Sequence, residues 1–415
     1  MRRAWGVPGI LLLGTLLAAC GSKGTKTNTD PINPGDKTDA GEKPPAPPPV
    51  QAGAFTHYLL ANGLPAYTKD EGGIVSGILD VSGDEAGNIW VAGGDGLYLL
   101  RKGENGFEKF TAEDGLQDYT ILSVAGLGPD EAMVGYQGVF GGMEDNDPEE
   151  MLKSGGADRV SVSGGTLSAT HYVIGTPPGT GFPNGRYKIR SVFTIRAVYD
   201  GPYAGDIWFG GNHGVGMWNA AEGAIIEYRY VAIEGPTFMA GDHFGIAFDA
   251  VGDVWIGGAH RVGKLQYATN GGDFFAPIDP VLDVWPDADD VNRTDDHVRA
   301  LAVDTSGKVW IGSLTNGLAS YDPAAGTCAF YTEADGLPGT AITSVAADPD
   351  GSIWVGTHTG LGRLDPETGG WTIMRHLTEA RLPTDEIMSV QIDTRTTPRT
   401  VYIGTLQGVS VYNGE

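Results

Sequence analysis

The sequence predicts an all-β fold of seven small antiparallel sheets, and three observations support this prediction. The first is a recurring phrase, Gly-x-apolar-Trp, as in Gly87–Trp90. The second is its spacing, because most copies are 43–55 residues apart, with one interval of 75, and such periods are typical of propeller blades. The third is the composition, since 65 glycines among 415 residues suit many tight turns. The aromatic column, with its weaker copies, consists of Trp90, Met133, Trp208, Trp255, Trp310, Trp354 and Tyr402. The predicted fold is therefore a seven-bladed β-propeller over residues 54–415.

A second column supports the same number of blades. An apolar–variable–small–apolar run precedes most copies of the phrase by about twelve residues, as in Ile78-Leu79-Asp80-Val81. We assign this run to strand a, the innermost strand of each blade, where crowding at the axis favours a small third residue. The seven runs cover residues 78–81, 121–124, 189–192, 243–246, 298–301, 342–345 and 387–390.

Turn chemistry separates the predicted strands. An Asp-x-x-Gly pattern lies between the two columns, and Asp348-Pro349-Asp350-Gly351 is its clearest copy. Asp side chains bond nearby backbone N–H groups and Gly accepts positive φ, so these residues predict a tight hairpin between strands a and b. Repetition at one hairpin position favours a turn role for these Asp residues over a ligand role.

The two ends of the propeller are predicted to meet in one blade. The chain stops just after the third strand of blade seven, at Val411-Tyr412. The missing fourth strand is present at the other end, as Ala54–Tyr58 followed by Asn62-Gly63-Leu64-Pro65, which copies Asp335-Gly336-Leu337-Pro338. We therefore expect the N-terminal strand to complete the last blade, which removes exposed sheet edges.

These motifs resemble the two-component regulator propeller repeat, and Ser344–Leu364 is the best copy. In that family such propellers often form the periplasmic sensor of a membrane histidine kinase. The resemblance implies a sensing or binding propeller, although this sequence shows no kinase or DNA-binding segment. The repeat is also distantly similar to streptogramin lyase propellers.

The N-terminus predicts export and lipidation. Arg2 and Arg3 precede a short apolar run that ends in Leu17-Ala18-Ala19-Cys20, which resembles the lipobox of bacterial lipoproteins. We expect residues 1–19 to be a signal peptide, Cys20 to carry the acyl chains, and residues 20–53 to be a disordered, Pro-rich tether. Gly21, in place of Asp, favours the outer membrane, with the side unspecified. An ordinary signal peptide with an incidental Cys is the alternative.

Charge and cysteine content narrow the function classes. The formal net charge is −25, which disfavours nucleic-acid binding. With Cys20 acylated, Cys328 has no partner for an intrachain disulfide, and we expect it to be a small buried residue in a strand. A closed ring of this kind is expected to be a monomer.

Strand parity predicts which face carries binding. In a four-stranded blade the b–c and d–a loops share one face, and the long segments 136–157, 175–187 and 279–297 all fall there. Two of these segments are strongly acidic. Their carboxylates suit Ca²⁺, although a solvated acidic loop is the simpler interpretation and a basic partner surface a further one, and no other cofactor is indicated. The candidate calcium ligands are Glu144, Asp145, Asp147, Asp287, Asp289 and Asp290.

Histidine and arginine residues gather at the same predicted mouth. Three histidines occupy b–c turns and two lie at or before strand a, so the candidate ligand-binding residues are His213, His243, His260, His297 and His358. Polar turn residues are the simpler interpretation of this group. Arg190 and Arg299 are predicted to share one strand-a position, where they could hold an anion. Asp80, at the small third position, is predicted to pair with one of them.

The expected function is non-catalytic recognition of a protein, peptide or glycan of the cell envelope. The sequence contains no Gly-x-Ser-x-Gly, His-Glu-x-x-His or P-loop motif, so it assigns no catalytic residue. A lyase or glycan hydrolase with a His and carboxylate site at the mouth is the alternative. A third option is a scaffold among envelope proteins.

Overall fold

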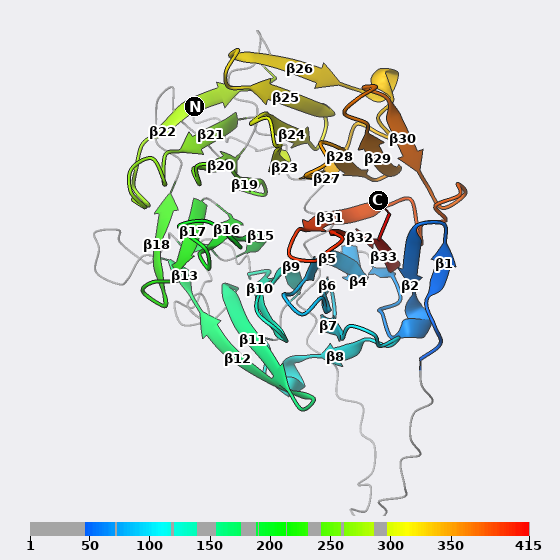
Figure 1. The fold of residues 1–415 in the computed structure, drawn as a ribbon. Helices are drawn as coiled ribbons and strands as arrows, with labels where there is room; N and C mark the ends of the chain where they lie inside the picture. Colours follow the sequence, from blue (N-terminus) through cyan, green and yellow to red (C-terminus); the bar gives the residue numbers. More distant parts are fainter. Residues whose placement is uncertain are drawn as a thin grey trace, which may run out of the picture.

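The structure is a computed structural model that describes residues 46–70, 73–117, 120–138, 155–175, 188–189, 191–212, 214–230, 242–258, 261–285 and 297–414. Within these residues the strands form seven sheets of four or five antiparallel strands around one axis, together with two small two-stranded sheets (Figure 1). The seven-bladed propeller predicted from the sequence is thus confirmed.

Strand a of each blade lies nearest the axis, and strand b pairs with it. The inner strands are β5 (Ile78–Gly83), β9 (Ile121–Gly126), β15 (Val192–Ala197), β19 (Ile246–Phe248), β23 (Val298–Val303), β27 (Ile342–Ala347) and β31 (Ile387–Asp393). The b strands are β6 (Ile89–Gly93), β10 (Glu131–Tyr136), β16 (Ile207–Gly211), β20 (Val254–Gly257), β24 (Val309–Ser313), β28 (Ile353–Thr357) and β32 (Thr400–Thr405).

Strands c and d continue each blade outwards. The c strands are β7 (Gly96–Leu100), β11 (Ala157–Ser163), β17 (Gly214–Asn219), β21 (Arg261–Leu265), β25 (Leu318–Asp322), β29 (Gly360–Leu364) and β33 (Gly408–Tyr412). The d strands are β8 (Glu108–Phe110), β12 (Thr166–Tyr172), β18 (Ala224–Tyr230), β22 (Ile278–Asp283), β26 (Thr327–Tyr331), β30 (Trp371–Met374) and, in blade seven, β2 (Phe55–Tyr58).

Short elements complete the fold. They are β1 (Val50–Ala52), β3 (Thr68–Asp70), β4 (Gly73–Ser76), β13 (Ile174–Gly175), β14 (Lys188–Ile189), and the 3-10 turns η1 (Leu60–Asn62), η2 (Ala112–Asp114) and η3 (Glu333–Asp335). Each 3-10 turn ends at a Gly with φ between 93° and 106°, which explains the repeated Asp-Gly-Leu or Asn-Gly-Leu sequence.

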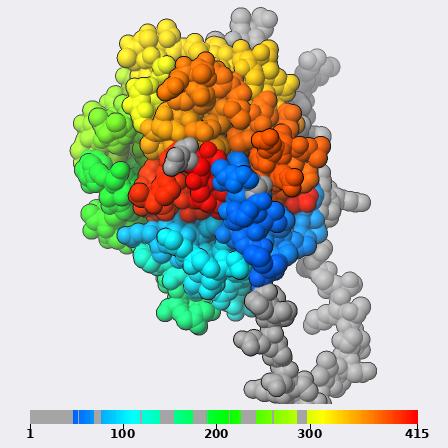
Figure 2. Space-filling view, turned by 45° about the vertical axis from the view of Figure 1, so that its right-hand side comes forward, coloured from blue at the N-terminus to red at the C-terminus, as the bar shows by residue number. Residues whose placement is uncertain are grey.

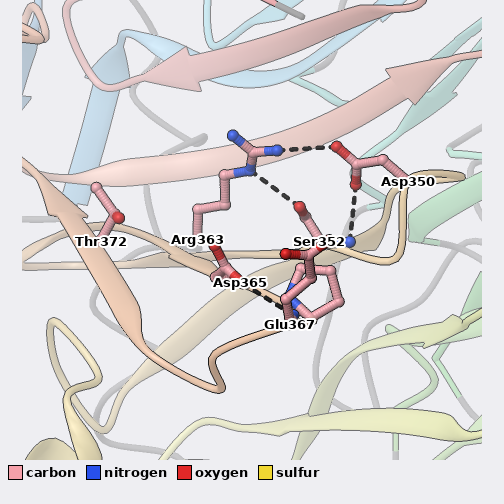
Figure 3. Close-up of a pocket in the computed structure, with 7 residues that line it drawn as sticks. Asp350, Ser352, Arg363, Asp365, Glu367 and Thr372 are labelled. Atoms are coloured by element: carbon pink, nitrogen blue, oxygen red, sulfur yellow. Dashed lines mark hydrogen bonds and ion pairs between the residues drawn. The ribbon is translucent and has the colours of Figure 1, made fainter.

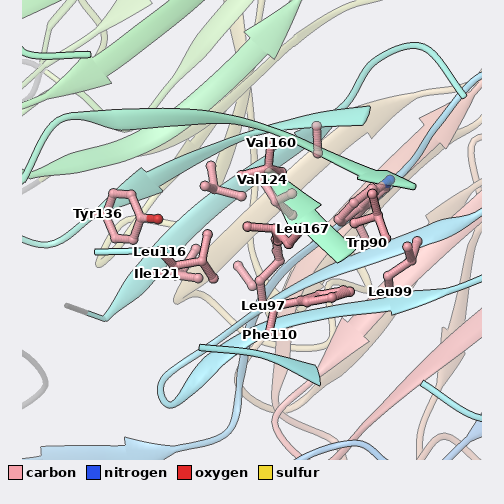
Figure 4. Close-up of a cluster of buried hydrophobic side chains, with 14 residues drawn as sticks. Trp90, Leu97, Leu99, Phe110, Leu116, Ile121, Val124, Tyr136, Val160 and Leu167 are labelled. Carbon is pink, nitrogen blue, oxygen red and sulfur yellow. The ribbon is translucent and has the colours of Figure 1, made fainter. Parts of the chain in front are cut away.

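Each aromatic-column residue fills the contact between its blade and the next. Trp90 packs with Leu97 and Leu99 of its own blade and with Ile121 and Val124 of blade two (Figure 4). The same arrangement recurs at every blade boundary, including Tyr402 between blades seven and one. Burying one large side chain per boundary contributes about 2–3 kcal/mol of transfer free energy, so the repeated residue holds the ring together.

The ring closes as predicted. Strand β2 pairs with β33, with Phe55 opposite Tyr412 and Tyr58 opposite Val409. Figure 2 shows the blue N-terminal strands beside the red C-terminal blade. The His57 ring is buried and bonds both Ser410 Oγ and Ala380 O at 2.8 Å. Strand β1 adds a fifth strand outside β2, so ordered structure extends into the segment assigned to the tether.

Repeated Asp residues stabilise the a–b hairpins, which confirms their turn role. Asp84 Oδ1 accepts hydrogen bonds from the backbone N–H groups of Ala86 and Asn88, both at 3.0 Å. Its Oδ2 accepts from Trp90 Nε1 at 3.1 Å. The equivalent Trp-to-Asp bond occurs at Trp310–Asp304 and Trp354–Asp348, so the turn also positions the aromatic column.

Three local predictions are wrong. In blade three the inner strand begins at Val192, because Arg196 pairs with Trp208, so the run at 189–192 was three residues early. In blade four, Asp279 and Asp283 lie in strand β22 rather than in a loop; this outermost strand has one unpaired edge, where Pro280 is tolerated. Cys328 is exposed, because β26 is likewise an outer edge strand.

Candidate ligand site at the upper mouth

A bulge near the start of strand a aims one side chain per blade toward the axis. In blade one, Ile78 pairs with Gly93 and Asp80 pairs with Ala92, so Leu79 is skipped. The same skip occurs in blades two, three, five, six and seven, and in blade four Phe244 holds the equivalent place, because Gly257 N–H donates to Gly245 O at 2.9 Å. A bulge turns a side chain out of the ladder. We call these residues the rim: Leu79, Leu122, Phe193, Phe244, Arg299, Thr343 and Met388.

Burial shows that the rim residues alone face away from the blade interior. The first and third residues of all seven runs are buried, whereas the second residue is partly exposed in six of them. The rim lies at the end of strand a that follows the d–a connection. It therefore lies on the face that carries the b–c and d–a loops, which we call the upper face.

Arg299 is the cationic member of the rim, and it lies in an aromatic stack. Its Cζ is 4.1 Å from the centroid of the Phe244 ring, and that ring stacks on Phe193 at 4.4 Å. Three successive blades thus contribute Phe, Phe and Arg to one stack. Burial lowers the pKa of Arg299 to about 10, although the carboxylate of Asp242 opposes that shift. The guanidinium remains charged at neutral pH.

The donors of Arg299 are largely unused. Its Nε is buried and bonds no described residue, and the described residues form no ion pair with its guanidinium. The interactions that the structure gives this side chain are the Phe244 ring and the electrostatic attraction of Asp242. The described structure therefore leaves this cation free to bind an anion.

Of the predicted histidines, the structure describes His243, His297 and His358. His297 packs edge-on against Phe244 at 5.8 Å, and His358 lies in the b–c turn of blade six, with part of its side chain exposed and part enclosed by neighbouring residues. Burial and the charge of Arg299 lower the pKa of His358, while Glu386 raises it, so these groups lie near one another. The described structure shows no hydrogen bond between His358 and Glu386. His243 is buried and contacts Gly257 O at 2.9 Å, which indicates a structural role.

Several predicted site residues lie outside the described residues. They are Cys20, His213, His260, Arg190 and the acidic residues Glu144, Asp145, Asp147, Asp287, Asp289 and Asp290. Within the described ranges, no group of three or more His, Cys, Asp or Glu is placed to hold a metal ion. In the same part of the chain, no helix is long and apolar enough to cross a membrane.

The predicted Arg pair does not form. Phe193, not Arg190, occupies the blade-three position equivalent to Arg299, because the inner strand begins three residues later than expected. Arg190 lies outside the described residues, and Asp80 forms no ion pair with Arg299 in the described part of the chain. Burial raises its pKa, and the cation that opposes this shift is Arg196.

Asp80 instead joins three blades near the axis. Its Oδ1 accepts from Ser389 Oγ of blade seven at 2.5 Å and from its neighbour Val81 N at 2.9 Å. Its Oδ2 accepts from Val124 N of blade two at 3.0 Å. Ser344 makes the same bond to Val390 N at 2.9 Å. In blades one, two, six and seven the third residue of strand a is therefore small and polar, because it bonds the next blade.

A second arginine lies at the opposite, lower mouth. It was not identified from the sequence. Arg395, in the a–b turn of blade seven, donates to Asp393 at 2.9 and 3.0 Å and to Gly83 O at 2.7 Å. It also donates to Gly126 O at 3.3 Å and to Leu127 O at 3.0 Å. Its Cζ lies 3.8 Å from the Tyr199 ring, so one side chain joins blades seven, one, two and three.

A shallow hollow of about 250 Å³ lies on the same lower face of blade six (Figure 3). Arg363 lies between Ser352 Oγ at 3.1 Å and Asp350 at 2.8 Å, and Asp350 also binds Arg399. The pKa of Asp350 is lowered, because hydrogen bonds from Ser352 and the two arginines outweigh its burial. The arginines of this hollow are already paired with Asp350, so we interpret it as a surface network rather than a ligand site.

The closed ring of seven sheets defines the chain as a β-propeller. Residues 336–359, which contain β27 and β28, match the family model described as two component regulator propeller. This match confirms the resemblance expected from the sequence. Comparison with curated protein sequences finds no match.

Solved propellers resemble the chain at low identity. Two structures of the extracellular domain of BT4673 from B. thetaiotaomicron, named as a putative one component and as a hybrid two component system, have TM-scores of 0.56 and 0.55 at 17% identity. They cover 82% and 81% of this chain, which spans 38% of theirs. YCF48 bound to D1 peptide has a TM-score of 0.52 at 13% identity, covering 89% of this chain and 99% of its own.

A lyase has the same fold. Virginiamycin B lyase from Staphylococcus aureus has a TM-score of 0.51 at 12% identity and covers 81% of this chain and 94% of its own. At these identities the likeness shows the propeller fold, and the functions of these proteins differ. The site residues must therefore decide the function of this chain.

Proposed function

We propose that this chain is a cell-envelope lipoprotein whose propeller binds a protein, peptide or glycan at the upper face without catalysis. The observation that carries the proposal is the bulged rim, where Arg299 lies on the Phe244–Phe193 stack with unused donors. Such a mixture of apolar surface and one specific polar group is typical of binding sites.

The comparisons support a binding role. The BT4673 structures are extracellular domains of a protein named as a one component or hybrid two component system, and YCF48 was solved bound to D1 peptide, so a propeller of this fold can bind a peptide. A lyase or hydrolase is the competing function. It would require a His and a carboxylate acting together at the rim, and His358 and Glu386 share no hydrogen bond in the described structure.

The lipid anchor belongs to the same proposal. The lipobox-like sequence before Cys20 supports acylation and an outer-membrane address, with the Pro-rich segment as a spacer. Cells grown with an alkyne analogue of palmitate should label the chain, and Cys20→Ser should abolish the label. Labelling of the Cys20→Ser chain would refute acylation at this residue.

Binding is tested by capturing envelope proteins and glycans with the detergent-solubilised chain, in parallel with an Arg299→Met variant. We expect the chain to capture a partner without altering it chemically. The Arg299→Met variant should capture less of this partner. Chemical turnover of the captured partner would favour the lyase or hydrolase. A parallel arm with EDTA tests the calcium prediction, because full capture in EDTA would reject it.

A further inference from the structure

We propose that the rim binds a carboxylate joined to an apolar group, such as the C-terminus of a peptide that ends in an apolar residue. Arg299 takes the carboxylate, and the apolar rim residues contact the adjoining side chain. This inference rests on the proposed binding function of the upper face and names its ligand class.

The cation is held in place before a ligand arrives. The Phe244 ring covers one face of the guanidinium at 4.1 Å, and Phe193 supports that ring from the next blade. A guanidinium carries five N–H donors in a planar fork that matches a carboxylate. Because contact with a ring uses a face of the fork, the donors along its edge remain available.

Apart from Arg299, most of the rim residues favour an apolar group of a ligand over a sugar. Five of the seven are apolar, namely Leu79, Leu122, Phe193, Phe244 and Met388. The Thr343 hydroxyl already donates to Ile387 O at 2.7 Å. A glycan needs many partners for its hydroxyl groups, and an unpaired buried polar group is costly. The rim therefore fits a peptide end better than an oligosaccharide.

The surrounding charge limits the ligand to a low negative charge. Asp242 lies close enough to Arg299 to affect its pKa, and Glu386 does the same for His358. The chain as a whole carries a formal charge of −25. A polyanion would be repelled by these carboxylates, whereas one carboxylate can be matched by one guanidinium.

The test uses the peptide N-acetyl-Ala-Ala-Phe as the free acid and as its C-terminal amide, with isothermal titration against the full chain. We expect the acid to bind at least about tenfold more tightly than the amide, because charge-assisted pairs with Arg are among the stronger hydrogen bonds. Arg299→Met should remove this difference. Arg299→Lys should retain part of it, since Lys keeps the charge and loses the fork.

Arg363→Met is the matched control, because it removes the same charge from the lower face of blade six. It should leave the preference for the acid unchanged. Equal affinity for acid and amide would overturn the proposal, and so would a preference that survives in Arg299→Met. Arg299-dependent binding of oligogalacturonate in place of the peptide would overturn the apolar part in favour of a glycan.

Failure of this inference can be told apart from failure of the proposed function. If the peptides do not bind while Arg299→Met still reduces partner capture, the ligand class is wrong and the binding function stands. If partner capture is unchanged by both Arg299→Met and Phe193→Ala, the upper mouth is not the binding surface. Unfolding midpoints in urea confirm that each variant is folded.

Discussion

The two mouths of this propeller each carry one prominent arginine, and the two arginines differ in the hydrogen bonds that they make. At the lower mouth, Arg395 makes hydrogen bonds to Asp393 and to the backbone carbonyls of Gly83, Gly126 and Leu127. At the upper mouth, Arg299 rests on an aromatic ring, and its Nε bonds no described residue. Both cations face a ring, so the difference lies in how many donors are already used.

This difference assigns a role to each end. A guanidinium whose donors are bound to three blades is a structural clamp, because removing it leaves several acceptors unpaired. Removing a guanidinium with unused donors should change the stability of the fold little, and those donors are available to bind a ligand. The lower mouth therefore stabilises the ring, and the upper mouth is the end at which we propose that a ligand binds.

The largest expected effect is loss of the lower clamp. Arg395→Met should lower the free energy of unfolding by about 3–5 kcal/mol, because it leaves the buried Asp393 carboxylate without its cation. Arg299→Met should lower it by less than about 1 kcal/mol, since it removes a cation–π contact. Urea unfolding followed by Trp fluorescence measures both. Equal losses would remove the distinction between the two mouths.

The bonds between blades near the axis should give the next effect. Asp80→Asn should cost about 1–3 kcal/mol, because in either orientation of the amide its NH₂ group faces a backbone N–H, that of Val124 or that of Val81. Asp80→Ser should cost less, since Ser344 at the same position of blade six bonds the next blade. Denaturation in urea at pH 7 ranks the two. A less stable Ser variant would refute the proposed bonding role of the third position.

A smaller effect is expected from the hydroxyl at the lower mouth. Tyr199 donates to Gly126 O at 2.9 Å, while its ring carries the contact with Arg395. Tyr199→Phe keeps the ring and should cost about 1 kcal/mol, the usual value of one hydrogen bond. Thermal unfolding measures this loss. A cost as large as that of Arg395→Met would show that the hydroxyl, rather than the guanidinium, holds the clamp.

Peptide binding at the upper mouth should depend on pH, whereas the contacts of Arg395 at the lower mouth should not. Because the pKa of Arg299 is lowered to about 10, the cation is present below that pH and is lost as the pH rises through it. Binding of the peptide acid should therefore weaken above about pH 10, towards the affinity of the amide. The pKa of Arg395 is raised by Asp393, so the clamp should persist. Titrations at pH 8, 9 and 10.5 test this, and a flat profile would contradict it.

Repetition explains why so much of the fold could be predicted. The Trp90 column, the Asp84-type turns and the Phe55 strand each rest on short-range patterns or on copies within the chain. The register of blade three could not be predicted in this way, because two overlapping runs share the required pattern and only pairing of Arg196 with Trp208 distinguishes them. The partners of Asp80 could not be predicted from local patterns either, because Ser389 and Val124 lie on other blades and come close to it only in the closed ring.

The sequence by itself determined the number of blades, their turns and the strand that closes the ring, since local turn chemistry and repeated burial act within one blade or its copies. The tertiary structure decided which side chains meet at the axis. Residues from blades one, two, three and seven converge on Arg395, and those from blades three, four and five form the Phe193–Phe244–Arg299 stack. Such contacts depend on how blades twist and pack, so no spacing along the chain encodes them.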